Sequence, residues 1–199
     1  MILLVLVGAF FCPPDQRLRV EPREWGRRAA PEGCAVAGVD VFDSNLTGEG
    51  DRLVQGRYRC GEKRSLRIAV LVPLPDGAQC KLDGEDISTE LSGGDKRILD
   101  FVELTQAGRK VVQVRDLGEG AARVSFFEAQ GWSLRKIFET PLLESIATAH
   151  GLLAQRWSFI FEGTAFPRSI RTQRCVEGAP CDDPVEFAYS KAGGKYVPK

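Results

Sequence analysis

The chain has 199 residues, which is enough for one domain with a sizeable core or for two small ones. It carries 27 Lys and Arg against 27 Asp and Glu, so its formal net charge is zero. A nucleic-acid binder needs an excess of cationic side chains facing the phosphates, so this balance argues against nucleic acid as a partner.

An uncharged apolar run covers the first residues and ends at Cys12, which is followed by two prolines. The run is too short to cross a bilayer as a helix, but it has the length of the apolar part of an export signal. We therefore predict that residues 1–12 are an export signal cleaved after Ala9, or a lipoprotein signal that lipidates Cys12. A lipid on Cys12 would be the only membrane attachment. The alternative is a buried first strand of a cytosolic domain.

Export places the protein in the periplasm, on the outer membrane through a lipid anchor, or outside the cell. Residues 13–33 mix arginine, glutamate and proline, which predicts a flexible, solvated tether. Residues 34–199 are predicted to form a single β domain.

The six cysteines contain no Cys-x-x-Cys pair, and the chain has one histidine, so the pattern does not indicate a zinc site. In an oxidising compartment disulfides are the default. Cys175 and Cys181 flank a turn-rich segment and are predicted to pair, and Cys60 is predicted to pair with Cys80. Cys12 and Cys34 either form a third disulfide or, if Cys12 is lipidated, leave Cys34 free.

Short runs rich in β-branched and aromatic residues alternate with Gly, Asp, Asn and Pro through most of the chain. Residues 66–72 alternate with period two, which is typical of a strand with one apolar face. The pattern predicts an antiparallel all-β fold. The predicted core is Val41, Leu53, Ile68, Val70, Val112, Val114, Val124, Phe126, Leu134 and Phe138.

One segment has helical spacing. After Pro141, the apolar residues Leu143, Ile146, Ala147 and Leu153 could share one face, which predicts a short helix over residues 142–155.

Residues 46–57 align without gaps on residues 104–115, at an offset of 58, and six of the twelve positions are identical. A fainter third copy begins at Thr164. A repeat of this length holds several strands, like the blade of a β-propeller. Two or three blades cannot close a propeller, so the sheets should be partial or open. A small closed barrel of lipocalin type is the alternative.

The loop between Phe42 and Leu53 resembles the calcium-binding loop of FG-GAP and VCBS repeats, which form propeller blades in secreted and surface proteins. The resemblance covers residues 40–140. It implies a hard-cation site of oxygen ligands with a glycine at the sharp bend. Thr47 stands where the family has an aspartate, so calcium binding should be weak or absent, and no other cofactor is expected. The alternative is an Asx-rich turn that binds nothing. The implied ligands are Asp43, Asn45, Thr47 and Asp51, with Gly48 at the bend.

The sequence has no Gly-x-Ser-x-Gly, His-Glu-x-x-His or P-loop motif. Two functions remain open. The first is a noncatalytic secreted or envelope-associated protein that binds a protein or glycan through loops of a β scaffold. The second is a secreted hydrolase that uses His150, which would need a nucleophile or carboxylate within hydrogen-bond reach.

Overall fold

The computed structural model describes residues 11–92, 94–118, 120–148 and 151–199, and most of them are in antiparallel strands. This confirms the all-β fold with open sheets. The predicted export signal lies mainly in residues outside the described part of the chain.

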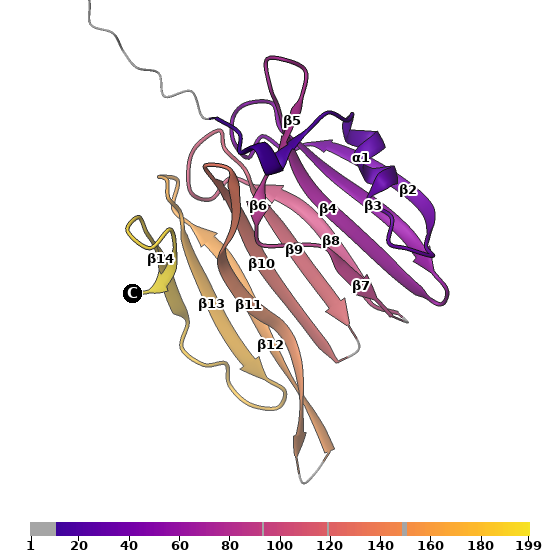
Figure 1. Ribbon diagram of the computed structural model, residues 1–199. Coiled ribbons are helices and arrows are strands. Elements are labelled where there is room, and N and C mark those ends of the chain that lie inside the picture. The colour runs from indigo at the N-terminus through magenta and orange to yellow at the C-terminus, as the bar shows by residue number, and fades with distance from the viewer. Residues whose placement is uncertain (1–10, 93, 119, 149–150) are drawn as a thin grey trace, which may run out of the picture.

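Sheet A is built from the N-terminal strands in the order β1-β5-β4-β3-β2. The short strand β7 pairs with the first half of β4, on the same edge on which β5 pairs with the second half. In Figure 1 it lies at the upper right, with the short helix α1 on its outer side. Its long strands β3 and β4 are joined by a two-residue turn in which Gly61 has a positive φ of 64°, a conformation that favours glycine. The strands are β1 (Arg17–Leu18), β2 (Ala35–Asp43), β3 (Arg52–Cys60), β4 (Lys63–Pro73), β5 (Gln79–Lys81) and β7 (Thr89–Leu91).

Sheet B follows chain order from β8 to β15, and every neighbouring pair is antiparallel. Figure 1 shows it running toward the lower left, where the hairpin of β11 and β12 reaches furthest down. Its strands are β8 (Lys96–Val102), β9 (Val111–Gly118), β10 (Ala121–Gln130), β11 (Ser133–Thr148), β12 (Gly151–Glu162), β13 (Ser169–Val176), β14 (Val185–Ser190) and β15 (Lys195–Pro198).

The two sheets pack face to face around a first core. Ile68 and Val70 of β4 meet Val112 and Val114 of β9 in one apolar cluster, to which the buried Cys80 also belongs. The chain between β5 and β7 leaves sheet A here and forms the short strand β6 (Asp83–Gly84), which pairs in parallel with the start of β11. This excursion bridges the two sheets.

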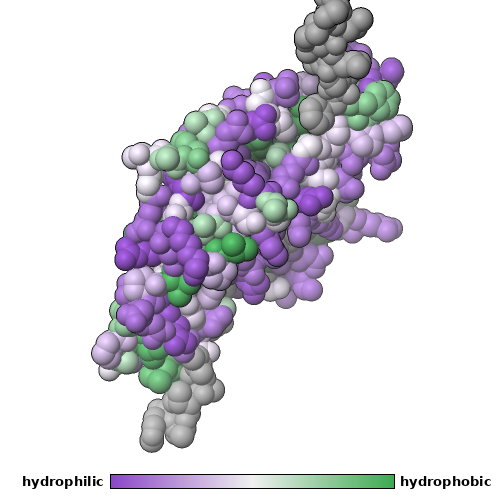
Figure 2. Space-filling view, turned by 90° about the vertical axis from the view of Figure 1, so that its left-hand side faces the viewer, coloured by the Kyte–Doolittle hydropathy of each residue, from purple (hydrophilic) through white to green (hydrophobic). Residues whose placement is uncertain are grey.

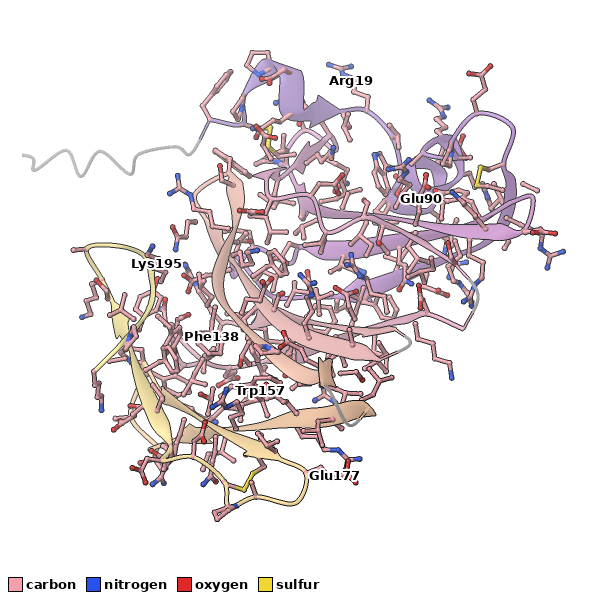
Figure 3. The ribbon with its side chains drawn as sticks, turned by 90° about the horizontal axis from the view of Figure 1, so that it is seen from below. Arg19, Glu90, Phe138, Trp157, Glu177 and Lys195 are labelled. Atoms are coloured by element: carbon pink, nitrogen blue, oxygen red, sulfur yellow. A yellow bond between two sulfur atoms is a disulfide. The ribbon has the colours of Figure 1, made fainter. Side chains whose placement is uncertain are left out.

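A second core lies on the opposite face of sheet B. Phe126 of β10 contacts the rings of Phe138, Phe159 and Phe161, at centroid distances of 6.0, 5.7 and 5.7 Å. Because both halves of one sheet supply side chains to this cluster, sheet B must curl around it. Figure 3 shows Phe138 within this curl. The face seen in Figure 2 is mostly hydrophilic, with hydrophobic residues in small separate patches.

The predicted core residues are buried, except that Val41 is only partly buried. Val41 packs on a third apolar cluster, and the other nine divide between the two cores, which the alternation alone did not indicate. Val111 and Val112 show why it arises: they are neighbours on β9 and face opposite cores.

Residues 13–33 are folded against sheet A, so the predicted flexible tether is wrong. They form a 3₁₀ turn (Pro14–Gln16), β1 and α1 (Pro22–Arg28). Trp25 packs on a third apolar cluster on the outer face of sheet A, and the Tyr58 hydroxyl donates a hydrogen bond to the carbonyl of Gly26. Burying an aromatic side chain against a sheet offsets the ordering cost of such a segment. In the described residues, no helix is both long enough and apolar enough to cross a bilayer.

The predicted helix over 142–155 is also wrong. Residues 142–148 continue β11, and residues 151–155 begin β12. Pro141 has no N–H to donate to a sheet, and it lies beside a register shift in the pairing of β10 with β11, which accommodates it. The apolar residues of this segment therefore belong to two strands and do not line a helix face.

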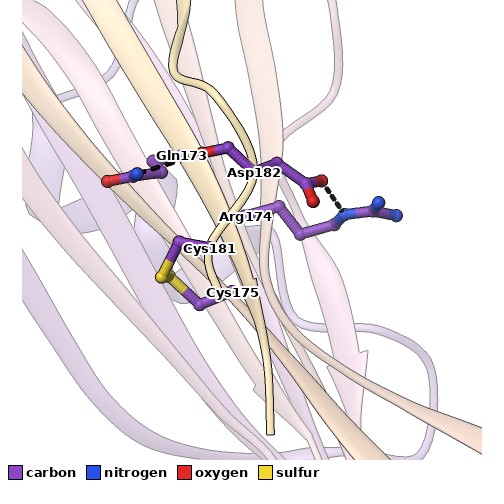
Figure 4. The surroundings of a disulfide bond; sticks show 5 residues. All are labelled: Gln173, Arg174, Cys175, Cys181 and Asp182. Atoms are coloured by element: carbon purple, nitrogen blue, oxygen red, sulfur yellow. Dashed lines mark hydrogen bonds and ion pairs between the residues drawn. A yellow bond between two sulfur atoms is a disulfide. The ribbon is translucent and has the colours of Figure 1, made fainter. Parts of the chain in front are cut away.

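Three disulfides join all six cysteines. The predicted bond between Cys175 and Cys181 is present (Figure 4). The predicted pairing of Cys60 with Cys80 is wrong: Cys60 pairs with Cys34, and Cys80 pairs with Cys12. The reason is topological, because Cys34 lies directly before β2, next to the end of β3. A disulfide-bonded Cys12 has no thiol for a lipid, so the structure contradicts lipidation at this residue.

Candidate functional site

The calcium-like loop, residues 44–51, is organised around Asp51. This carboxylate is 1% exposed, and it accepts hydrogen bonds from the backbone N–H groups of Leu46 and Thr47, both at 2.9 Å. The hydroxyls of Ser44 and Thr47 also donate to it. Burial tends to raise the pKa of Asp51, but the hydrogen bonds outweigh it and hold that pKa below its usual value.

The other implied ligands do not gather around Asp51. The Asp43 carboxylate is 84% exposed and forms an ion pair with Arg52 at 2.8 Å. The Asn45 amide donates to the carbonyl of Gly108 at 2.6 Å. Of the four predicted ligands, the structure therefore brings together only Thr47 and Asp51. The hydrogen bonds explain the loop without a cation, and weak or absent calcium binding stays a prediction.

The two segments of the predicted repeat occupy comparable positions. Each consists of a loop and the first part of the strand that follows it, which is β3 in residues 46–57 and β9 in residues 104–115. The aligned Gly50 and Gly108 both have a φ of 74°, and the aligned Leu46 and Leu104 are 1% and 0% exposed. The repeat itself stays a prediction, which these similarities favour.

His150 lies outside the described residues. Asp182 accepts a hydrogen bond from Arg174 at 2.5 Å beside the Cys175–Cys181 disulfide (Figure 4). Among the described residues, no three His, Cys, Asp or Glu side chains are grouped as a metal site would require.

A groove of about 550 Å³ lies where sheet A ends at β7 and leaves part of sheet B uncovered. It is at the end of β8 and β9 remote from the loop 103–110. Its volume is within the range of about 300–1,000 Å³ that is typical of ligand sites. The lining residues come from β7, from Asp95 before β8, from the ends of β8, β9 and β10, and from the middle of β11: Thr89, Glu90, Leu91, Asp95, Lys96, Arg97, Asp116, Leu117, Gly118, Ala121, Ala122, Arg123, Glu139, Pro141, Leu143 and Glu144.

Fixed ion pairs hold the groove in shape. The Arg97 guanidinium is only 13% exposed and forms two hydrogen bonds to the Asp116 carboxylate, at 2.5 and 2.8 Å. It also donates to the carbonyl of Ile87, which ties the excursion from sheet A to sheet B. Such a two-point contact fixes orientation as well as charge.

A second network surrounds Glu139 on β11. Ser125 donates to its carboxylate at 2.8 Å, and Lys136 lies 3.2 Å from it. Burial tends to raise the pKa of Glu139, but the bond from Ser125 and the charges of Lys136 and Arg123 outweigh burial and lower it. This carboxylate is therefore ionised at neutral pH.

Not all charges of the groove are paired. In the described part of the chain, three acidic side chains of the lining, Glu90, Asp95 and Glu144, form no ion pair or side-chain hydrogen bond, and neither does the basic Lys96. The lining holds five acidic and three basic side chains, so its formal charge is −2. The sequence does not predict this groove. The signal that it offers is a set of charged residues, such as Arg97 and Asp116, inside strand-like runs.

No family model, curated protein or solved structure matches the chain.

Proposed function

We propose that this chain is a noncatalytic, exported β-repeat protein that binds a partner protein through the groove at the open end of its two sheets. The observation that carries the proposal is the groove itself, whose inner charges are fixed in pairs while others at its rim are free. Prearranged side chains reduce the ordering cost of binding. Arginines such as Arg97 and Arg123 are enriched at protein interfaces.

A protein partner suits the groove better than a glycan. Aromatic side chains offer the flat apolar faces on which sugar rings pack. The described lining of the groove contains no aromatic residue, and it combines apolar Pro141 and Leu143 with charges of both signs. That mixture resembles a protein–protein interface.

Three disulfides are typical of exported proteins. We further propose processing after Ala9, because that cleavage leaves Cys12 in the mature chain, where it can pair with Cys80. The mature protein would then reside in the periplasm or outside the cell. The resemblance to FG-GAP and VCBS repeats, which belong to proteins of these compartments, agrees with this proposal.

Chemical crosslinking in the native host tests the groove. The variant Arg123→Glu with Glu144→Lys should lose the crosslinked partner that the wild type retains, because both changes invert a rim charge. The matched control, Arg19→Glu with Glu177→Lys, inverts exposed charges outside the groove and should retain it. The same three proteins, tested on a glycan array, should show no groove-dependent signal. Equal crosslinking by both variants, or a glycan signal that the groove variant abolishes, would contradict the proposal.

A further inference from the structure

Sheet A stops at β7, which pairs with β4 along Arg64, Ser65 and Leu66. In the described residues no strand pairs with the other edge of β7. In an antiparallel ladder the backbone groups of alternate residues point away from the partner strand. The edge of β7 that faces away from β4 therefore offers N–H and C=O groups that no strand of the described residues pairs, beside the groove that Thr89, Glu90 and Leu91 line. The hydroxyl of Thr89 donates a long hydrogen bond of 3.4 Å to the carbonyl of Glu90.

The floor of the groove is the part of sheet B that sheet A does not cover. Leu143 and Pro141 of β11 and Ala121 of β10 supply apolar surface there. A strand placed next to β7 would lie about 4.8 Å from it and would continue sheet A over this surface. The groove is therefore a position at which the two-sheet packing is incomplete by about one strand.

The free charges of the groove indicate the kind of strand that fits. Glu90 lies on β7 itself, and Glu144 lies on β11 at the opposite wall. Neither has an ion-pair partner within the described residues. Figure 3, which views the molecule from below, shows Glu90 beside the strands of sheet A and Glu177 at the opposite side of the molecule. A segment with Lys or Arg side chains would compensate the negative rim charge.

We propose that the groove binds an extended, cationic segment of a partner protein by strand addition to β7. The backbone of the segment pairs with the free edge of β7, and its Lys or Arg side chains reach Glu90 and Glu144. This inference rests on the proposed function and specifies its mode of binding. Because β7 has three residues, it supplies only a few backbone hydrogen bonds, so the charges must provide much of the specificity.

Synthetic peptides on the full-length, disulfide-bonded protein test the inference. The probes are a labelled alternating Lys–Val peptide, its Glu–Val counterpart, and two Lys–Val peptides N-methylated at alternate amides of either parity. Fluorescence anisotropy should show that the Glu–Val peptide binds at least about tenfold more weakly. One N-methylated peptide should lose binding while the other retains it, because only one set of amides faces β7. Amide NMR shifts on binding should centre on Thr89, Glu90 and Leu91.

Protein variants separate this inference from the function on which it rests. Glu90→Lys with Glu144→Lys should weaken binding of the Lys–Val peptide about tenfold, and Glu177→Lys, an exposed acid outside the groove, should not. Equal binding of both N-methylated peptides would overturn strand addition and leave the groove proposal standing. Binding that is unaffected by the groove variant would overturn both.

Discussion

At the scale of single residues, Asp51 shows how one buried carboxylate shapes a loop. Its oxygens accept two backbone N–H groups and two hydroxyls from residues that precede it by four to seven positions. The sequence left two roles open for Asp51, a calcium ligand or part of an Asx-rich turn, because an aspartate after a glycine-containing loop can face a cation or the loop amides. Only the folded loop distinguishes the two.

Replacing Asp51 with alanine should lower the free energy of unfolding by about 2–4 kcal/mol at pH 7, because buried donors lose their acceptor. Urea unfolding measures this change. The control Asp43→Ala removes an exposed ion pair with Arg52 and should cost less than about 1 kcal/mol. Equal losses in both variants would contradict the role given to Asp51.

The pH dependence follows from the same contacts. The pKa of Asp51 is lower in the folded than in the unfolded chain. Its ionised carboxylate therefore adds fully to the free energy of unfolding above the pKa of the unfolded chain, and this contribution is lost as the pH falls through the pKa of the folded chain. Asp51→Asn does not titrate, and its stability should therefore fall less steeply than that of the wild type below about pH 4.

Among the elements, the strands were predictable, but the one predicted helix, over residues 142–155, was wrong and α1 was not predicted. Alternation over 66–72 identified β4 because one face of this strand is buried in a core. The helix α1 has only seven residues, too few for a helical apolar stripe to appear in the sequence. It forms because Trp25 and Gly26 fit against sheet A.

Gly26 is the point of closest approach between α1 and sheet A. A Cβ built there would lie 2.4 Å from a methyl carbon of Val39. Gly26→Ala should therefore lower the melting temperature, at a cost of about 1–3 kcal/mol, although alanine has the higher helix propensity. Arg27→Ala on the exposed side of α1 is the matched control, and calorimetry should find it nearly neutral. Stabilisation by Gly26→Ala would mean that α1 does not pack as described.

The disulfides differ in the length of chain that they close. Cys12–Cys80 spans 68 residues and Cys175–Cys181 spans 6. In the chain-entropy model, replacing both cysteines of the longer loop by serine should cost about 4 kcal/mol and those of the shorter loop about 2 kcal/mol. Denaturant titration of the two double variants checks the order. Cys12 and Cys80 are also buried in the first core, so replacing them with serine should increase the cost of losing the longer loop further.

At the scale of the whole molecule, sheet B is the shared element of the structure. One of its faces packs on sheet A, and the other encloses the aromatic core. The sequence identified the buried residues but could not assign them to two cores, since alternation specifies only that a face is buried. The groove could not be predicted from the sequence either, because it forms only where sheet A ends and sheet B continues.

Because β9 and β10 contribute to both cores, we expect the sheets to unfold together in one cooperative transition. Ile170 is fully buried in the aromatic core and lies on β13, in the half of sheet B that ends with β15. Ile170→Ala leaves a cavity there and should cost about 2–5 kcal/mol. Hydrogen exchange by mass spectrometry should then show the same loss of protection in β3 of sheet A as in β13. The control Ile160→Ala removes a side chain that is 52% exposed on the neighbouring strand β12 and should change neither. If Ile170→Ala weakened only β12 to β15, sheet B would contain an independently unfolding half, and the shared-sheet argument would fail.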